Sequence, residues 1–369
     1  MRQRNRIRFQ SRVLGCARWA VIVAGALFFA ASCQGITYRV IKHNRLDTSG
    51  RARGIATQDQ YAYIADGEDG LKILNISNPT GLKKTGAVGL SGFAGRIAVE
   101  GDLAVVTDTT QNCVYIVDVS DKFAPVLKWT FKTLDRVREA AIQGGIAFLA
   151  ERGDDPLDPG YFSGVQAISC GLTAAPANLN SAAIADVRDV AVTSGQVFIL
   201  SPTGLTVLSR SAKGFATAPL ATLSISSTED LQSIDSRAGT HLLILGQSLY
   251  LVDITTASKP VVKDQTAVSG YAQNRVVTSS GILPSAGSGS SPQFIRFGYS
   301  TLHEYGVGAA ELTTQKILFV VLGVDLDKES KGRLKLYDME MRKDFATFYA
   351  TGDVFAVGAI DNYGLGVAY

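Results

Sequence analysis

Arginine recurs along the chain at a nearly regular spacing, each time at the start of a short apolar segment. The positions are Arg53, Arg96, Arg138, Arg188 and Arg275, in the segments RGIAT, RIAVE, REAAI, RDVAV and RVVTS. A guanidinium is a planar, permanently charged donor that suits phosphate and carboxylate groups. If the fold brings these arginines to one mouth, we expect a site for an anionic ligand such as a phosphate, a uronate or another carboxylate.

The same pattern has a structural interpretation. An arginine at a repeated position can bond to a carboxylate or a carbonyl group of the neighbouring unit, and Glu139 and Asp189 directly follow two of the arginines. The sequence leaves both interpretations open.

A second group of chemically capable side chains lies in ERGDDPLDPG, at residues 151–160. Asp154, Asp155 and Asp158 are weak candidates for a metal site, because carboxylates clustered in a loop suit Ca²⁺. A solvated acidic loop is the alternative. We expect no cofactor, with calcium at this loop as the one exception.

Catalytic groups are sparse in this sequence. The chain has three histidines, none at a metal-ligand spacing, and no set of Ser, His and Asp can be assembled from the sequence. We therefore expect no catalytic residues, and a binding protein rather than an enzyme.

The elements that must position these residues form a repeat. YAYIADGEDGLKILNI, at residues 61–76, has two short apolar arms around an acidic, glycine-containing turn, which is the pattern of a β-hairpin. Related hairpins follow at residues 103–121, 146–169, 196–211, 242–260 and 317–340. The short strands that precede the hairpins start in steps of 42 to 50 residues.

A period in the forties with about four strands per unit is typical of a β-propeller. One four-stranded sheet has two apolar faces and cannot cover either alone, whereas sheets stacked radially around an axis cover both. We count eight units, with seven as the alternative because the unit at residues 275–306 is degenerate. First strands line the central channel, so the arginines are expected on one face of the disc.

The last unit, VFAVGAIDNYGLGVAY, has only two strands. GITYRVIKHNRLD, at residues 35–47, contains two strands that could complete it. We expect these N-terminal strands to pair with the C-terminal ones, so that residues 33–369 form one propeller domain.

Residues 1–32 have the composition of a secretory signal. Six arginines precede WAVIVAGALFFAA, an apolar run of 13, and small residues then precede Cys33. Thirteen residues are fewer than the roughly 20 that a membrane-spanning helix needs. Removal of the six arginines changes the net charge from +3 to −3, so the basic charge gives no argument for nucleic-acid binding.

The tetrapeptide Ala30-Ala31-Ser32-Cys33 resembles the lipobox of bacterial lipoproteins. The resemblance implies cleavage before Cys33 and lipidation of that cysteine, and Gln34 implies the outer membrane of a two-membrane bacterium. An ordinary cleaved signal or a short signal anchor is the alternative, because Ala30 stands where leucine is usual.

The other two cysteines of the mature chain, Cys113 and Cys170, are expected to be free. In the register of the repeats they lie near opposite faces of the disc, farther apart than the roughly 7 Å between Cα atoms that a disulfide can span. Cys113 is expected to be the more exposed of the two.

VYIVDVSDKFAPV, at residues 114–126, and LYLVDITTASKPV, at residues 249–261, are close copies of one pattern, and GLKILNISNP and RLKLYDME are looser copies. Here the chain resembles the LVIVD-repeat family of secreted bacterial β-propellers. The resemblance implies a surface or periplasmic binding propeller and provides no catalytic residues.

Two function classes stay open. The first is a non-enzymatic, membrane-tethered binding or scaffolding lipoprotein of the bacterial envelope, a monomer whose partner is an envelope protein or an anionic ligand. The second is a propeller enzyme, similar to lactonases or quinone-cofactor dehydrogenases, acting on an anionic small molecule. The second class needs carboxylates, histidines or a metal at the channel mouth, which arginine-rich strand starts fit poorly.

Overall fold

The computed structural model describes Leu46 and residues 48–78, 81–228, 230–237, 240–246 and 248–267, together with the backbone of seven strands between residues 293 and 368. All of these described elements are β-strands. Within this part of the chain, no helix has the length and apolar character to cross a bilayer.

The strands form antiparallel sheets in which each strand pairs with the next one in the sequence. The first sheet contains β1 (Gly54–Gln58), β2 (Tyr61–Ala65), β3 (Leu71–Asn75) and β4 (Lys83–Val88). The second contains β5 (Ala94–Glu100), β6 (Leu103–Asp108), β7 (Cys113–Asp118) and β8 (Val126–Lys132). The third contains β9 (Val137–Gln143), β10 (Ile146–Arg152), β11 (Ser163–Ser169) and β12 (Ala177–Ala183).

The later sheets follow the same order. The fourth contains β13 (Asp189–Val192), β14 (Gln196–Ser201), β15 (Gly204–Ser211) and β16 (Gly214–Ser224). The fifth contains β17 (Ser233–Arg237), β18 (His241–Leu245), β19 (Ser248–Asp253) and β20 (Val261–Ala267). A five-stranded sheet contains β21 (Gln293–Gly298), β22 (Gly306–Leu312), β23 (Ile317–Leu322), β24 (Arg333–Asp338) and β25 (Lys343–Tyr349). A two-stranded sheet contains β26 (Val354–Ile360) and β27 (Tyr363–Ala368).

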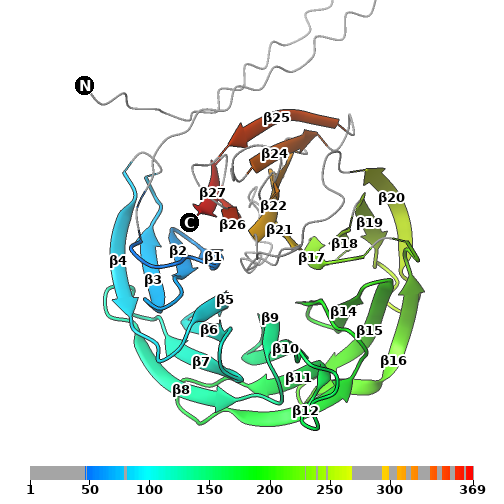
Figure 1. The fold of residues 1–369 in the computed structure, drawn as a ribbon, viewed down its shortest axis with the longest axis horizontal. Coiled ribbons are helices and arrows are strands. Elements are labelled where there is room, and N and C mark those ends of the chain that lie inside the picture. The colour runs from blue at the N-terminus through cyan, green and yellow to red at the C-terminus, as the bar shows by residue number, and fades with distance from the viewer. Residues whose placement is uncertain are drawn as a thin grey trace, which may run out of the picture.

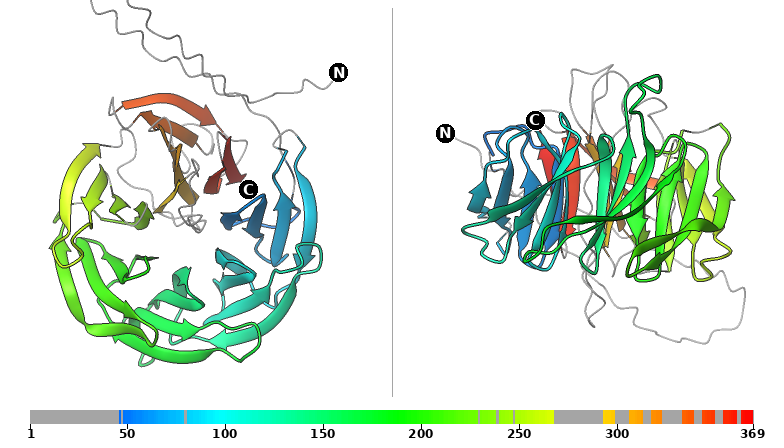
Figure 2. Two further views of the ribbon diagram at one scale, coloured as in Figure 1. Left: turned by 180° about the vertical axis from the view of Figure 1, so that it is seen from behind. Right: turned by 90° about the horizontal axis from the view of Figure 1, so that it is seen from below.

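The sheets stand radially around a common axis, and Figure 1 looks along that axis. In each of the first five sheets the first strand lies innermost and the fourth lies on the outer rim. From the side, the sheets form a flat disc (Figure 2). The protein is therefore all-β and is built from repeated four-stranded antiparallel sheets in a propeller arrangement, as the repeat period predicts.

The hydrophobic core lies between neighbouring sheets. Tyr63 of the first sheet and Ile97 and Tyr115 of the second belong to one buried cluster. Similar clusters join the second sheet to the third, the third to the fourth and the fourth to the fifth. Both faces of a middle strand are thus covered, which explains why all six residues of β6 are buried.

Polar contacts fasten the far end of the inner strands to the next sheet. Gln58 at the end of β1 exchanges two hydrogen bonds of 2.8 Å with the backbone of Gly101. One repeat later, Glu100 accepts the backbone N–H groups of Gly144 and Gly145 at 2.8 and 2.9 Å. These three glycines have φ between 59 and 69°, a conformation that favours glycine, so the turns can present their N–H groups to the side chain.

The described strands form seven sheets, so the predicted count of eight units is not confirmed. Between residues 293 and 349, where the sequence predicts parts of two units, the strands form one five-stranded sheet. The last unit has two described strands, as predicted, and β26 lies beside both β22 and β1. Apart from Leu46, the expected closing strands at residues 35–47 fall outside the described residues, and their pairing stays a prediction.

Cys113 and Cys170 are both free, as predicted. Both are buried, with 6% and 3% of their surface exposed, so Cys113 is the more exposed by a small margin only. Burial raises the pKa of the Cys170 thiol to about 12, which makes it unreactive at neutral pH. Cys33 lies outside the described residues.

Replacement of Glu100 by alanine should lower the free energy of unfolding by roughly 1–2 kcal/mol, because two backbone N–H groups lose a charged acceptor. Glu100→Gln keeps one acceptor oxygen and should lose less. Urea unfolding of the three proteins measures the difference. Equal stability of the wild type and Glu100→Ala would show that this contact does not hold the second and third sheets together.

Candidate functional site

Four of the five predicted arginines lie in the described part of the chain, at the same end of successive inner strands. Arg53 directly precedes β1, Arg96 lies in β5, Arg138 lies in β9, and Arg188 directly precedes β13. Arg275 lies outside the described residues. We call the end of the disc where these inner strands begin the channel mouth.

Arg53 and Arg96 make contacts along the ring of inner strands. Arg96 Nη1 donates to the carbonyl oxygen of Arg53 at 2.6 Å, and its Nε lies 3.8 Å from Glu139 Oε2 on β9. The guanidinium carbon of Arg53 lies 5.7 Å from the centre of the Phe93 ring, within the range of a cation–π contact. These contacts join the first three sheets.

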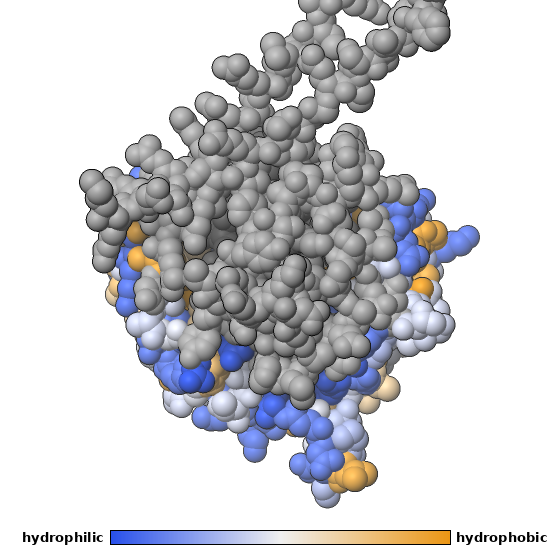
Figure 3. Space-filling model, turned by 45° about the horizontal axis from the view of Figure 1, so that its top comes forward, coloured by the Kyte–Doolittle hydropathy of each residue, from blue (hydrophilic) through white to orange (hydrophobic). Residues whose placement is uncertain are grey.

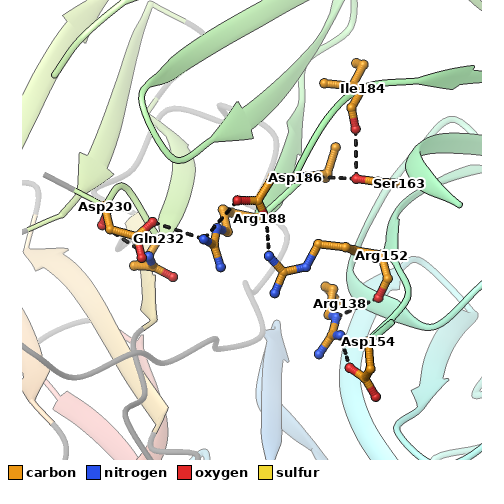
Figure 4. A network of polar contacts seen from close by, with 10 residues as sticks. Arg138, Arg152, Asp154, Ser163, Ile184, Asp186, Arg188, Asp230 and Gln232 are labelled. Carbon is orange, nitrogen blue, oxygen red and sulfur yellow. Dashed lines mark hydrogen bonds and ion pairs between the residues drawn. The ribbon is translucent and has the colours of Figure 1, made fainter. Parts of the chain in front are cut away.

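A polar network at the channel mouth extends from the third sheet to the segment before the fifth (Figure 4). In its first half, Arg138 Nε donates to the carbonyl oxygen of Arg152 at 2.9 Å. Asp154 forms ion pairs with both Arg136 and Arg138. These residues hold the start of β9 to the end of β10 and the loop after it.

Asp186 is the centre of the second half of the network. Its Oδ1 pairs with Arg152, and its Oδ2 lies 3.1 Å from Arg188 Nη2. The same Arg188 nitrogen lies 3.2 Å from Oδ1 of Asp230, in the segment before β17. Across both halves, the four arginines exceed the three aspartates by one positive charge.

These contacts are of the kind that the structural interpretation of the arginine pattern describes, because carbonyl groups and carboxylates accept the guanidinium donors. They do not test the binding of an anion, which stays a prediction. The network is partly open to solvent, with side-chain exposures from 10% for Arg188 to 56% for Asp154.

The loop between β10 and β11 contains the three aspartates named as weak metal ligands. Asp154 pairs with the two arginines described above. Asp155 Oδ1 accepts the N–H of Leu157 at 2.9 Å, and Asp158 Oδ1 accepts the N–H of Gly160 at 2.8 Å, as in turns that aspartate favours. Over the described residues, no three His, Cys, Asp or Glu side chains are grouped so that they could hold a metal ion.

A recurring set of buried carboxylates was not recognised from the sequence. These acids lie at the end of the second strand in the first three sheets, and each is 0% exposed; they are Asp66, Asp108 and Glu151. Successive members are 42 and 43 residues apart in the sequence. Asp66 Oδ2 accepts the N–H of Gly50 at 3.1 Å, and Glu151 Oε2 accepts the N–H of Asp135 at 2.7 Å. They thereby hold segments that lead into an inner strand. The sequence contains a pattern that could have identified them, namely an acidic residue at the end of an apolar strand in YIAD, VVTD and FLAE.

Two of these carboxylates are electrostatically compensated. Lys72 Nζ lies 2.5 Å from Asp66 Oδ2 and provides a buried counter-charge. Asp108 accepts hydrogen bonds from the Tyr115 hydroxyl at 2.7 Å and from the Thr110 N–H at 2.6 Å. Burial alone would raise the pKa of Asp108, but these hydrogen bonds outweigh burial and lower it.

Among the described residues, no counter-charge of this kind contacts Glu151. Its Oε1 is buried and has no hydrogen-bond partner in the described part of the structure. Burial raises the pKa of Glu151 to about 8, although the backbone N–H groups of Asp135 and Leu134 act in the opposite direction. The side chain therefore holds its proton more tightly than an ordinary glutamate does, and it lies next to the base of the loop that carries Asp154.

Comparison with known families identifies part of the chain. The LVIVD repeat family matches residues 49–88 and 91–133, which contain the first and second sheets. The match confirms the resemblance drawn at residues 114–126. The copy at residues 249–261 lies in the fifth sheet, outside the matched residues. No curated protein matches this chain.

Solved propeller structures are similar in fold. The WD40 β-propeller domain of Doa1 matches with a TM-score of 0.54 and 11% identity, over 85% of this chain and 88% of that one. Sqt1 of Saccharomyces cerevisiae matches at 0.54 and 9% identity, over 86% and 80%. Hydrazine synthase of Kuenenia stuttgartiensis matches at 0.56 and 11% identity, over 89% and 99%. Identities this low support the fold alone.

Stability should depend on the ionisation of Glu151. Its pKa is about 8 in the folded state against an ordinary value of 4.5, so the folded state binds the proton more tightly. The stabilising contribution is complete below pH 4.5 and is lost as the pH rises through 8. Glu151→Gln, which is neutral at every pH, should therefore be more stable than the wild type at pH 9 by several kcal/mol, since one unit of pKa corresponds to about 1.4 kcal/mol.

Thermal unfolding of both proteins at pH 5, 7 and 9 measures this dependence, and the difference should shrink toward pH 5. Asp108→Asn is the control: the lowered pKa of Asp108 means that its loss should destabilise the protein at pH 7 and 9. A difference between Glu151→Gln and the wild type that is constant with pH would show that Glu151 is ionised throughout.

Proposed function

We propose that this chain, a β-propeller protein with LVIVD repeats, is a non-enzymatic binding or scaffolding lipoprotein of the bacterial envelope. Cys33 carries the lipid that tethers it to the outer membrane. The protein acts as a monomer whose partner is another envelope protein or an anionic ligand.

The observation that carries this proposal is the pairing of the charged groups at the channel mouth. In an enzyme, acids, bases or metal ligands converge on the position of a reacting group. At this mouth, the described charges pair across the boundaries between sheets, as Arg152 does with Asp186 and Arg188 with Asp230. Such pairs connect neighbouring sheets at the mouth, which supports a binding platform.

The described surface also supports a polar mode of binding. Among the coloured residues in Figure 3, hydrophilic ones predominate and apolar ones lie in small, separate patches. The exposed large apolar residues of the described part are spread over several sheets and loops; they are Phe123, Val126, Leu134, Leu157, Leu220 and Val261. A surface of this kind favours a partner held by hydrogen bonds and charge over one held by a large apolar interface.

An enzyme that acts on an anionic small molecule is the second candidate. The excess of arginine over aspartate in the network favours an anion at the mouth. Hydrazine synthase, one of the similar structures, is an enzyme by its name, but at 11% identity the likeness carries the fold alone. Elemental analysis and an absorption spectrum of the purified protein separate the candidates, since a bound metal or organic cofactor would favour the enzyme.

The proposal includes closure of the ring by residues 35–47, pairing with β26 and β27. The position of β26 beside β1 supports this closure. With this closure, the seven described sheets are the seven blades of the propeller. The count of eight, which the repeat period favours, needs a further sheet from residues outside the described part.

Replacement of Cys33 by serine should release the protein from the membrane fraction. The wild type should sediment with outer membranes in high salt and incorporate labelled palmitate. Cys33→Ser should do neither, and a Cys16→Ser variant is the matched control and should behave as the wild type. Retention of Cys33→Ser in the membrane fraction would show a signal anchor in place of a lipid. An envelope protein cross-linked to the wild type in cells and co-purified after detergent extraction would identify the partner.

Deletion of residues 352–369 should abolish cooperative unfolding, because it removes the strands with which the N-terminal segment is proposed to pair. Deletion of residues 35–45 should have a similar effect in a protein that keeps its leader and Cys33. Circular dichroism during heating measures both. A deletion variant that stays soluble and melts in one cooperative transition near the wild-type temperature would rule out this closure.

A further inference from the structure

We propose that Arg152 and Arg188 form a binding site for a carboxylate group, and that the carboxylate of Asp186 occupies this site in the unliganded protein. A ligand carboxylate binds by displacing the Asp186 side chain. The inference deepens the proposed binding function and depends on it, because it assigns one ligand class to the channel mouth.

The geometry around Asp186 shows what the two arginines accept. One carboxylate lies between two guanidiniums from different sheets, with Oδ1 on Arg152 and Oδ2 on Arg188 (Figure 4). Each oxygen of the carboxylate thus has its own charged donor. A planar group of two oxygens with one negative charge satisfies this arrangement, and a carboxylate at the end of a ligand is chemically equivalent to the resident one.

The two arginines are held in place without the ligand. Their side chains are only 22% and 10% exposed, and Arg188 has a second ion-pair partner in Asp230. The carbonyl oxygen of Arg152 accepts the bond from Arg138. In addition, Arg152 Nε is buried without a hydrogen-bond partner among the described residues. Low exposure strengthens the attraction of these charges for an anion.

The Asp186 side chain, in contrast, is suited to leave. It is 43% exposed, so it can move into solvent. Its backbone has φ of 51°, in the left-handed region that glycine, asparagine and aspartate adopt most readily. The turn itself stays in place when the side chain moves, because the flanking N–H groups of Ile184 and Val187 donate to the backbone oxygen and the hydroxyl of Ser163, respectively.

Asp186→Gly and Asp186→Asn remove the resident carboxylate and tolerate the positive φ. Isothermal titration of the purified protein with acetate, in a buffer free of other carboxylates and of phosphate, measures the site. Both variants should bind acetate at least tenfold more tightly than the wild type. A second substitution, Arg152→Gln or Arg188→Gln, should abolish that gain.

Asp102→Asn is the matched control, because it removes the same charge from a partly exposed ion pair with Lys122 elsewhere on the disc. An equal gain in Asp102→Asn would overturn the site in favour of a general charge effect. No gain in either Asp186 variant, with melting temperatures near that of the wild type, would overturn it outright. Inorganic phosphate that binds more tightly than acetate would overturn the assignment to carboxylates. These results leave the membrane tether and the envelope partner untouched, so the failure of this inference and of the proposed function can be told apart.

Discussion

The constraint on which the whole structure depends is that each small sheet has two apolar faces. Buried clusters between consecutive sheets meet this constraint from the first sheet to the fifth. The other face of the first sheet is covered too, since Ile64 and Leu74 there are only 3% exposed, and β26 lies beside this sheet. The outer strands differ from the inner ones: β8 alternates between exposed and half-buried residues because its outer side faces solvent. A radial arrangement follows directly from this need for cover.

Polar side chains then fasten the two ends of the inner strands, by different chemistry at each end. At the far end, Gln58 and Glu100 bond to backbone N–H groups of glycine turns one sheet further on. At the channel mouth, charged pairs and buried carboxylates make the contacts. Asp66 and Glu151 accept hydrogen bonds from the segments that lead into the inner strands. Contacts between residues about one repeat apart, such as Gln58 with Gly101 and Arg188 with Asp230, thus connect successive sheets at both ends.

The features that the sequence predicted correctly are ones that recur with the repeat period, although the recurring acids at Asp66, Asp108 and Glu151 were not recognised as buried. Alternating strands and turns identified the β-propeller, and the spacing of the arginines placed Arg96 and Arg138 at equivalent ends of inner strands. Two kinds of feature could not be predicted from the sequence. The partners of the arginines, such as Asp186 and Asp230, lie in the connecting segments just before the inner strands, and only the fold shows which arginine each of them meets. The burial of Glu151 was not predicted, because an acid at the end of an apolar strand looks like an ordinary strand terminus in the sequence.

Asp186 and Asp189, three residues apart, show how the same arginine-rich channel mouth can stabilise the fold and also bind a ligand. Asp189 is fully buried, and its carboxylate accepts hydrogen bonds from the Ser233 hydroxyl and the Ile234 N–H of the next sheet at 2.7 and 2.9 Å. Loss of these bonds would leave buried donors unsatisfied, so Asp189 is a permanent part of the fold. Asp186 contacts the network only through ion pairs at a partly exposed position, where such pairs contribute little to stability. The cost of replacing its carboxylate by another is correspondingly small. A binding role at the mouth therefore does not compete with the contacts that hold the disc together.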